Sequence, residues 1–241
     1  MPRIYLDMPL ASGQQLNLPE QAARHVQVLR LQPGEPLMLF NGQGGEFEAK
    51  VVEMGKRHVT VDVGQHQAEE RESPLQLTLV QALSAAERMD YTVQKATELG
   101  VHCIQVVQSA YCSYKLAQDR VEKRVLHWQG VAESAAEQCG RTRVPQILPP
   151  VRLDSWLAQA PAADLKLLLS PTGARQWHEL PPQAGSVQVL IGPEGGFSGD
   201  EDNMAIAAGF TPLILGPRLF RTETVAPVIA ALLQARYGDF Q

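Results

Sequence analysis

Two loops rich in glycine and proline near the C-terminus carry the residue types best suited to binding a small molecule. Each follows a short apolar run: VQVLI precedes the loop GPEGGFS at 192–198, and LIL precedes the loop GPRLFRTE at 216–223. Apolar runs of this length, bounded by Gly and Pro, are typical of buried strands. Gly195 and Gly196 leave the backbone open to a ligand, and Pro193 stiffens the approach. One such loop is equally consistent with a plain turn, but two charged loops in tandem favour a ligand site.

The chain lacks the usual phosphate-binding motifs. It has neither a GxxxxGK[ST] P-loop nor a GxGxxG fingerprint, and Glu194 would repel a phosphate placed in its own loop. An adenosine-like ligand without a phosphate tail fits better, because its ribose hydroxyls and base edges need backbone groups and apolar walls. Candidates for the walls are Leu190, Ile191, Leu215 and Leu219. The first three are also expected in the strand core whether or not a ligand touches them.

Composition limits the class of protein. The 241 residues carry a net charge of -5, which argues against indiscriminate binding to polyanions, so a nucleic-acid partner requires a local basic patch. No apolar run approaches the roughly 18 residues of a membrane span, and the N-terminus lacks the apolar region of a signal peptide. The three cysteines form no C-x-x-C pair and have no histidine at zinc spacing. We therefore expect a cytoplasmic protein with no metal and no membrane partner.

A change of pattern near residue 70 predicts two domains, at 1–70 and 74–241, joined by a charged linker. Before the change, alternating runs separated by glycine-bearing turns indicate a small antiparallel meander or barrel. These runs are 36–40, 46–54 and 58–64. After it, strands alternate with helices, which is typical of an α/β domain with a parallel sheet.

The second domain has clear element boundaries. Strands are predicted at 75–83, 103–109 and 165–169, and helices at 87–99, at about 118–139, from Ser198 to Gly209, and after Thr222. S-x-x-E capping boxes at Ser84 and Ser198 predict two of the helix starts, and Thr222 is the expected cap of the last helix. The strand at 165–169 ends in a third loop, Ser170-Pro171-Thr172-Gly173.

Four segments together carry a resemblance that covers essentially the whole chain. They are QKATELGV at 94–101, EQCGRTRVP at 137–145, IGPEGGFSGDE at 191–201 and LGPRLFRTET at 215–224. In order and spacing they closely resemble the family of 16S ribosomal RNA uridine N3 methyltransferases. Any one segment alone would be weak evidence for this resemblance. The resemblance implies an S-adenosylmethionine-dependent enzyme of the SPOUT superfamily. It also implies an N-terminal PUA-like β-barrel, a C-terminal α/β domain with a parallel sheet and a trefoil knot, and a homodimer that acts on 16S rRNA in the small ribosomal subunit.

The resemblance places S-adenosylmethionine among the three loops at 169–173, 191–196 and 215–222, which are the loops that the residue pattern indicates. The cofactor-binding residues that it implies are Leu169, Ser170, Pro171, Thr172, Ile191, Gly192, Pro193, Glu194, Gly195, Gly196, Leu215, Gly216, Leu219, Arg221 and Thr222.

Methylation at uracil N3 requires loss of a proton as the N–C bond forms, with negative charge spreading onto O2 and O4. A guanidinium aimed at those oxygens stabilises that charge and favours loss of the proton. Arg221 is the predicted catalytic residue. Glu223 and Glu194 are candidates for a general base, with water as the alternative, and Glu223 is better explained as an acid that complements a helix N-terminus.

The residues predicted to contact RNA fall into two groups. Arg24, His25 and Arg30 lie in a basic part of the small domain, some of which is expected to be only solvated surface. Lys95, Glu137, Arg141 and Arg218 lie in or beside the family motifs. Lys95 either approaches the site or extends to solvent, and Glu137 either reads a base edge or simply finishes a helix. The expected target is a splayed, single-stranded base, because pairing hides N3.

The chain departs from the family pattern after the strand at 103–109. Many members carry an acidic-basic pair there, whereas this chain has Ala110, Tyr111, Cys112 and Ser113. Two rival functions remain open. One is methylation of a ribose 2′-hydroxyl, and the small barrel and the TET sequence after Arg221 argue against it. The other is a noncatalytic RNA-binding factor, and the intact cofactor loops argue against that.

Overall fold

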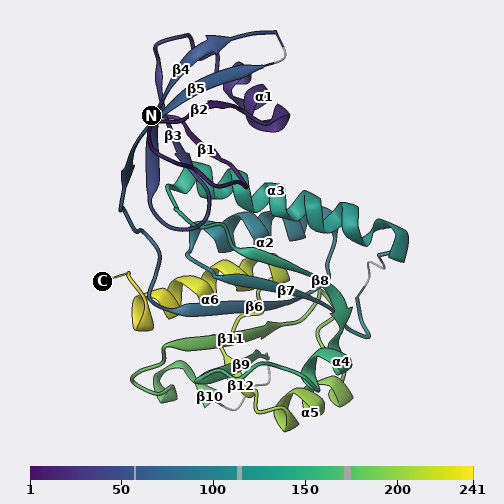
Figure 1. Ribbon diagram of the computed structural model, residues 1–241. Coiled ribbons are helices and arrows are strands. Elements are labelled where there is room, and N and C mark those ends of the chain that lie inside the picture. The colour runs from purple at the N-terminus through teal and green to yellow at the C-terminus, as the bar shows by residue number, and fades with distance from the viewer. Residues whose placement is uncertain (57, 113–115, 171–174, 241) are drawn as a thin grey trace. The chain divides into compact units, whose positions relative to one another are not determined.

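The computed structural model describes residues 1–56, 58–112, 116–170 and 175–240 (Figure 1). The chain forms two compact units. The first comprises Met1–Glu72 together with Glu133–Val144, and the second comprises Ser73–Ala132 together with Pro145–Gln241. The first unit is therefore assembled from two separate stretches of sequence.

The first unit is built on a five-stranded sheet. The strands are β1 (Arg3–Tyr5), β2 (Gln15–Asn17), β3 (Pro36–Phe40), β4 (Glu46–Met54) and β5 (Val59–Gln67), in the order β1-β3-β4-β5-β2. β3, β4 and β5 form the predicted antiparallel meander, and β1 adds to its edge in parallel with β3. Alternate side chains such as Ile4, Leu39 and Val61 fill its core. Helix α1 (Glu20–Val28) buries Ala22, Ala23 and Val26 and is not among the predicted elements.

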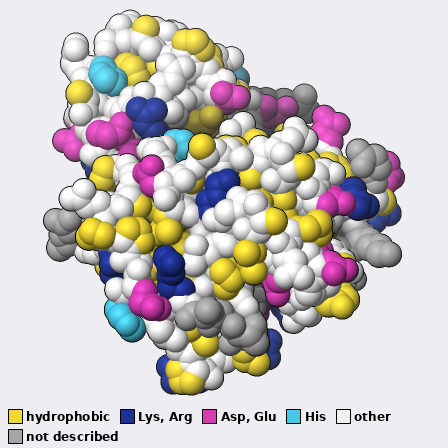
Figure 2. Space-filling model, turned by 90° about the horizontal axis from the view of Figure 1, so that it is seen from below, with side chains coloured by type: hydrophobic (Ala, Val, Ile, Leu, Met, Phe, Trp, Pro, Cys, Tyr) yellow, Lys and Arg dark blue, Asp and Glu magenta, His cyan; other side chains and the backbone are white. Residues whose placement is uncertain are grey.

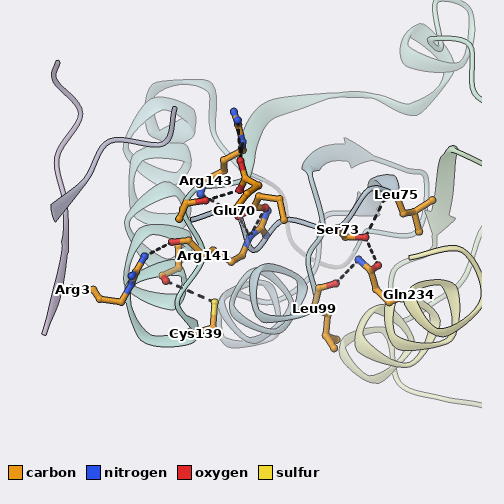
Figure 3. A network of polar contacts seen from close by, with 12 residues as sticks. Arg3, Glu70, Ser73, Leu75, Leu99, Cys139, Arg141, Arg143 and Gln234 are labelled. Atoms are coloured by element: carbon orange, nitrogen blue, oxygen red, sulfur yellow. Dashed lines mark hydrogen bonds and ion pairs between the residues drawn. The ribbon is translucent and has the colours of Figure 1, made fainter. Parts of the chain in front are cut away.

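The second stretch of the first unit is the end of helix α3 (Val121–Cys139) and the loop after it. Arg141 donates to Glu72 over 3.0 Å (Nε to Oε2), and Arg143 pairs with Glu70 over 3.2 Å (Nη2 to Oε2; Figure 3). Arg3 Nη2 donates to the carbonyl of Arg141 over 2.9 Å. These contacts attach residues 133–144 to the β-sheet unit.

The second unit contains a seven-stranded, wholly parallel sheet in the order β10-β12-β9-β11-β6-β7-β8, which confirms the predicted α/β class. The strands are β6 (Gln76–Ala82), β7 (Cys103–Gln108), β8 (Gln146–Arg152), β9 (Leu165–Leu169), β10 (Arg175–Gln176), β11 (Ser186–Ile191) and β12 (Thr211–Ile214). Most residues of β6, β9 and β11 are apolar, as expected for a sheet with helices on both faces.

Helices pack on the two faces of this sheet. Alternate residues such as Val80, Leu168 and Leu190 pack against α4 (Leu153–Leu157) and α5 (Gly199–Ala207). The opposite face is covered by α2 (Ala86–Glu98) and α6 (Thr222–Tyr237), which lie side by side (Figure 1). Two short 3-10 helices, Gln118–Arg120 and Trp177–Glu179, complete the elements. A membrane-spanning stretch is absent from the helices that the structure describes.

One predicted helix cap is confirmed and two are wrong. Ser198 caps α5, because its Oγ accepts from the backbone N–H of Glu201 over 3.3 Å while Glu201 Oε2 accepts from the N–H of Ser198 over 2.9 Å. Helix α2 instead follows Ala85 without a side-chain cap, and the Ser84 hydroxyl is buried with no partner among the described residues. Arg221 precedes α6, and Thr222 lies inside the helix because its hydroxyl bonds elsewhere.

Candidate functional site

A cavity of about 600 Å³ opens at the carboxyl ends of β9, β11 and β12 in the second unit. Its size falls within the range of small-molecule sites, and its position is the usual one for ligands of parallel sheets. The lining residues are Arg88, Leu169, Ser170, Ile191, Gly192, Pro193, Glu194, Gly195, Gly196, Leu213, Ile214, Leu215, Gly216, Pro217, Arg218, Leu219, Phe220, Arg221, Thr222 and Val225.

The GPEGG segment forms a tight turn that favours glycine at two positions. Gly196 has a φ of +71°, in the left-handed region, and its N–H donates to the carbonyl of Pro193 over 2.9 Å. A Cβ on Gly192 would lie 3.3 Å from the Cα of Gly196. At its three glycines the turn therefore presents main-chain groups, rather than side chains, to the cavity.

A buried hydroxyl joins this turn to the start of α6. Thr222 Oγ1 donates to the carbonyl of Gly192 over 2.7 Å and accepts from Nε2 of Gln81 over 3.0 Å. Gln81, at the end of β6, is fully buried, and its Nε2 also donates to the carbonyl of Ala82. One side chain thus fixes the two loops and the central strand with respect to one another.

An ion-pair chain occupies the charged side of the cavity. Arg88 pairs with Glu194, and its Nε lies 3.7 Å from Oε2 of Glu223. Burial raises the pKa of the Glu194 carboxyl, but the backbone N–H groups of Glu194 and Ala85 and the Arg88 guanidinium outweigh it and hold the pKa below its usual value. Glu194 is consequently an anion engaged by donors, which makes it a weak general base.

Two arginines in the second loop, unlike Arg88, form no ion pair with the described acidic residues. Arg218 and Arg221 line the cavity, are exposed, and have no acidic partner within the described part of the chain. Leu219 between them is 82% exposed. Unpaired guanidinium groups beside a cavity remain available to an incoming anionic or electron-rich ligand.

The predicted cofactor residues gather at this cavity. Those that line it are Leu169, Ser170, Ile191, Gly192, Pro193, Glu194, Gly195, Gly196, Leu215, Gly216, Leu219, Arg221 and Thr222. Pro171 and Thr172 lie outside the described residues. The pairing of Arg88 with Glu194 was not predicted, because it spans 106 positions and leaves no periodic signal in the sequence.

The predicted RNA-binding residues of the first unit occupy different settings. Arg24 is exposed and pairs with Glu20 over 3.0 Å (Nη2 to Oε1), and Arg30 is exposed with a φ of +57°. His25 Nδ1 lies 3.3 Å from Oε2 of Glu137, whose Oε1 accepts from the N–H of Tyr5 over 2.9 Å.

Two more of the predicted RNA-binding residues are engaged inside their own units. Arg141 is 6% exposed and bonds to Glu72. Lys95, in α2, pairs with Glu98 over 2.8 Å (Nζ to Oε1) and does not line the cavity. On the face shown in Figure 2, Lys and Arg side chains of the described residues lie among apolar and acidic ones and form no continuous basic patch. Within the described ranges, no three His, Cys, Asp or Glu side chains gather in a way that could hold a metal ion.

Comparison with known proteins defines the class first. Residues 71–234 match the RNA methyltransferase domain family, and residues 18–64 match the RNA methyltransferase PUA domain family. The parallel sheet with the loops at its strand ends therefore belongs to an RNA methyltransferase domain, and the small β unit belongs to a PUA domain.

Individual relatives narrow the class. Ribosomal RNA small subunit methyltransferase E of Buchnera aphidicola subsp. Schizaphis graminum is 33% identical over 240 residues, covering 99% of this chain and 98% of that protein. The crystal structure of the Neisseria gonorrhoeae protein of that name, bound to S-adenosyl methionine, is 37% identical, covers 100% of both chains and has a TM-score of 0.94. A Legionella pneumophila structure with the bound cofactor SAM is 40% identical, covers 99% of this chain and 98% of that one, and has a TM-score of 0.95. The chain belongs to the ribosomal RNA small subunit methyltransferase E family, which confirms the resemblance seen in its motifs.

Proposed function

We propose that this protein transfers a methyl group from S-adenosylmethionine to N3 of a uridine in 16S rRNA of the small ribosomal subunit. The observation that carries the proposal is the cavity of about 600 Å³ between the GPEGG and GPRLFRTET loops, in a chain whose relatives in N. gonorrhoeae and L. pneumophila hold S-adenosylmethionine. Family membership supports the RNA substrate. The N3 position rests on the resemblance and on the chemistry of the site.

The cavity suits the cofactor chemically. Leu169, Ile191, Leu215 and Val225 supply apolar walls for an adenine ring, and the GPEGG turn supplies main-chain donors and acceptors for ribose hydroxyls. We propose that Ser170, Pro171, Thr172, Gly216, Leu219 and Thr222 complete the cradle. When bound, the cofactor supplies an electrophilic methyl group on a sulfonium.

Arg221 is the residue that we propose for catalysis. As N3 forms a bond to the methyl carbon and the S–CH₃ bond breaks, the N3 proton leaves and negative charge develops on the uracil carbonyl oxygens. An unpaired guanidinium at the cavity stabilises that charge and lowers the barrier to proton loss. Arg218 is proposed to bind the RNA backbone beside it, since exposed arginines pair readily with phosphate.

The destination of the N3 proton follows from the ion pairs. Glu194 is held ionised by donors that include Arg88, and its lowered pKa makes it a weak proton acceptor. We therefore assign the proton to Glu223 or to a water molecule, and Glu194 to the fixing of Arg88. The other residues proposed to contact RNA are Lys95, Arg24, His25, Arg30, Glu137 and Arg141. Glu137 lies against His25 and Arg141 pairs with Glu72, which favours a structural role for these two.

The remaining features are also proposals. The family resemblance supports a trefoil knot formed by the three loops, a homodimer packed through the knotted domain, and a cytoplasmic site of action. The strand order β12-β9-β11, in which β9 lies between two strands that follow it in sequence, is compatible with a threaded connection. The division of the chain at Glu72 and Ser73 supports domain boundaries at 70 and 74, whereas residues 133–144 group with the first unit instead of the second.

The test is methyl transfer from labelled S-adenosylmethionine to small ribosomal subunits that lack the modification, with free 16S rRNA alongside. Digestion to nucleosides and mass spectrometry then identify the product. Label in 3-methyluridine is the expected result, and label in a ribose would move the chain to the rival class of 2′-O-methyltransferases. Cofactor binding with no label in either RNA would contradict the proposed substrate.

A further inference from the structure

An exposed aromatic side chain stands beside the cavity without contributing to the core. Tyr111, in the turn after β7, is 55% exposed. A Cβ added to Gly195 would lie 3.1 Å from the Cβ of Tyr111 and 3.5 Å from its carbonyl oxygen. Gly195 itself lines the cavity. Tyr111 therefore packs against the GPEGG turn, and more than half of its surface remains accessible to solvent.

The turn that carries Tyr111 is held in place by hydrogen bonds on both sides of it. The N–H of Ala110 donates to Oε1 of Glu201 over 2.7 Å, and Glu201 is 7% exposed at the start of α5. The N–H of Cys112 donates to the carbonyl of Ser109 over 3.3 Å, and the N–H of Ser109 donates to Sγ of Cys112 over 3.4 Å. A large ring on an anchored turn loses little freedom on binding, which favours recognition by a rigid surface.

A nucleobase is the ligand chemistry that fits this ring. The proposed reaction requires a uracil taken out of its stack, because pairing and stacking bury N3. Proteins that hold splayed or single-stranded bases commonly stack them on exposed aromatic rings. Arg218 and Arg221, unpaired at the same cavity, supply the cationic groups that such sites combine with aromatic stacking.

We propose that Tyr111 stacks on an unpaired base of the rRNA at the mouth of the cofactor cavity and thereby positions the target uridine. The inference rests on the proposed function for the identity of the RNA. Tyr111 acts on RNA affinity and not on cofactor affinity, since Gly195 contributes backbone to the cavity while the tyrosine ring faces solvent. It is a positioning residue, and its effect appears in KM for RNA.

The test compares Tyr111→Ala, Tyr111→Leu and Tyr111→Phe with the wild-type protein, using small ribosomal subunits that lack the modification. Tyr111→Ala and Tyr111→Leu are expected to raise KM for the subunits roughly tenfold, the scale of one lost base–aromatic stack. Tyr111→Phe keeps the ring and is expected to stay within about twofold. Cofactor affinity by calorimetry is expected to stay the same in all three variants. Phe240→Ala, which removes another exposed aromatic ring of the second unit, is the matched control and is expected to be neutral.

Direct binding of the same subunits, measured by filter retention, separates this inference from the proposed function. If the wild-type protein transfers no methyl group, the proposed function fails, yet the order of subunit affinities among the variants still tests Tyr111. Equal affinities for Tyr111→Ala and wild type would overturn the stacking role. An equal loss of subunit affinity in Tyr111→Phe would also overturn it, because the effect would then belong to the hydroxyl. A parallel loss of cofactor affinity would overturn it as well, because the effect would then belong to loop packing.

Discussion

The hydroxyl of Thr222 donates a 2.7 Å hydrogen bond to the carbonyl of Gly192, joining two loops that are 30 positions apart in sequence. Because the same hydroxyl accepts from the buried Gln81, neither loop can shift without breaking a buried polar contact. The shape of the cavity is therefore set by a side chain that belongs to a helix.

Thr222→Val should weaken both folding and cofactor binding. The substitution keeps the volume but leaves the Gly192 carbonyl and one Gln81 bond unmade, at a cost of about 1–3 kcal/mol. We expect a lower midpoint of urea unfolding and cofactor affinity reduced by roughly tenfold, or ~1.4 kcal/mol. Thr222→Ser retains the hydroxyl and is the control. Unchanged cofactor affinity in Thr222→Val would show that the link does not shape the cavity.

Arg221→Ala should separate catalysis from cofactor binding. Losing one donor to a developing oxyanion commonly lowers turnover by roughly 10² or more. Cofactor affinity, measured by calorimetry, is expected to stay within a few-fold because the cavity walls are unchanged. Arg221→Lys keeps the charge without the planar fork and should recover part of the loss. Near-wild-type turnover in Arg221→Ala would remove this residue from the mechanism.

Ser198→Ala tests the confirmed capping box. Loss of an N-cap hydroxyl typically costs ~1 kcal/mol, so urea denaturation should show a loss of that size. Ser84→Ala is the matched control, because the buried Ser84 hydroxyl has no partner among the described residues and its removal should not lower the free energy of unfolding. Equal losses in the two variants would contradict the assignment of α2 and α5 starts.

Arg141→Ala distinguishes a structural role from an RNA contact. Arg141 is buried against Glu72, and removing one partner from such a pair costs about 3 kcal/mol. Replacing both residues, as in Arg141→Met with Glu72→Met, should recover much of that stability, as measured by thermal unfolding. If Arg141→Ala is as stable as the wild-type protein but binds ribosomal subunits poorly, Arg141 contacts RNA and its role is not structural.

Glu133 should make the first unit less stable as pH rises. Burial, together with Glu137 and Asp7, raises the pKa of Glu133 from 4.5 to about 7. Since the folded state holds the proton more tightly than the unfolded chain, this contribution is complete below the unfolded value and is lost as pH rises through about 7.

Glu133→Gln mimics the protonated form and should remove this pH dependence. We expect the variant to match the wild-type protein near pH 4.5 and to be more stable at pH 8 by on the order of 1 kcal/mol, after allowing for solvent screening. Urea unfolding at several pH values measures the difference. A constant difference across this range would show that Glu133 does not titrate between the two states.

Much of the second unit was predictable because its signals are local. The apolar runs ending at Leu169 and Ile191 give the positions of β9 and β11 to within a residue, and the Ser198 capping box gives the start of α5. Gly195 and Gly196 indicate a loop that exposes its backbone to a ligand, and both line the cavity.

The errors arise where a residue that suits a local role is used by tertiary structure instead. Threonine is a common helix cap, but the hydroxyl of Thr222 donates to the Gly192 carbonyl and accepts from Gln81 instead. Arg141 is a predicted RNA contact because it lies beside a family motif; the structure places it against Glu72, and its role toward RNA stays a prediction. Arg88 reaches Glu194 only after the chain has folded, so no spacing rule could have identified it.

The division of the first unit between Met1–Glu72 and Glu133–Val144 has a consequence for biosynthesis. Ribosomes deliver the chain from the N-terminus, and a unit completes its folding only when all its parts have emerged. The N-terminal β-sheet must therefore wait, with Glu70 and Glu72 lacking their arginines, until the chain has been extended past Val144. By the time Val144 has emerged, two strands of the other unit's sheet, β6 and β7, and the helix α2 between them have already emerged, and β8 follows at once. The two units therefore begin to fold over the same stretch of synthesis.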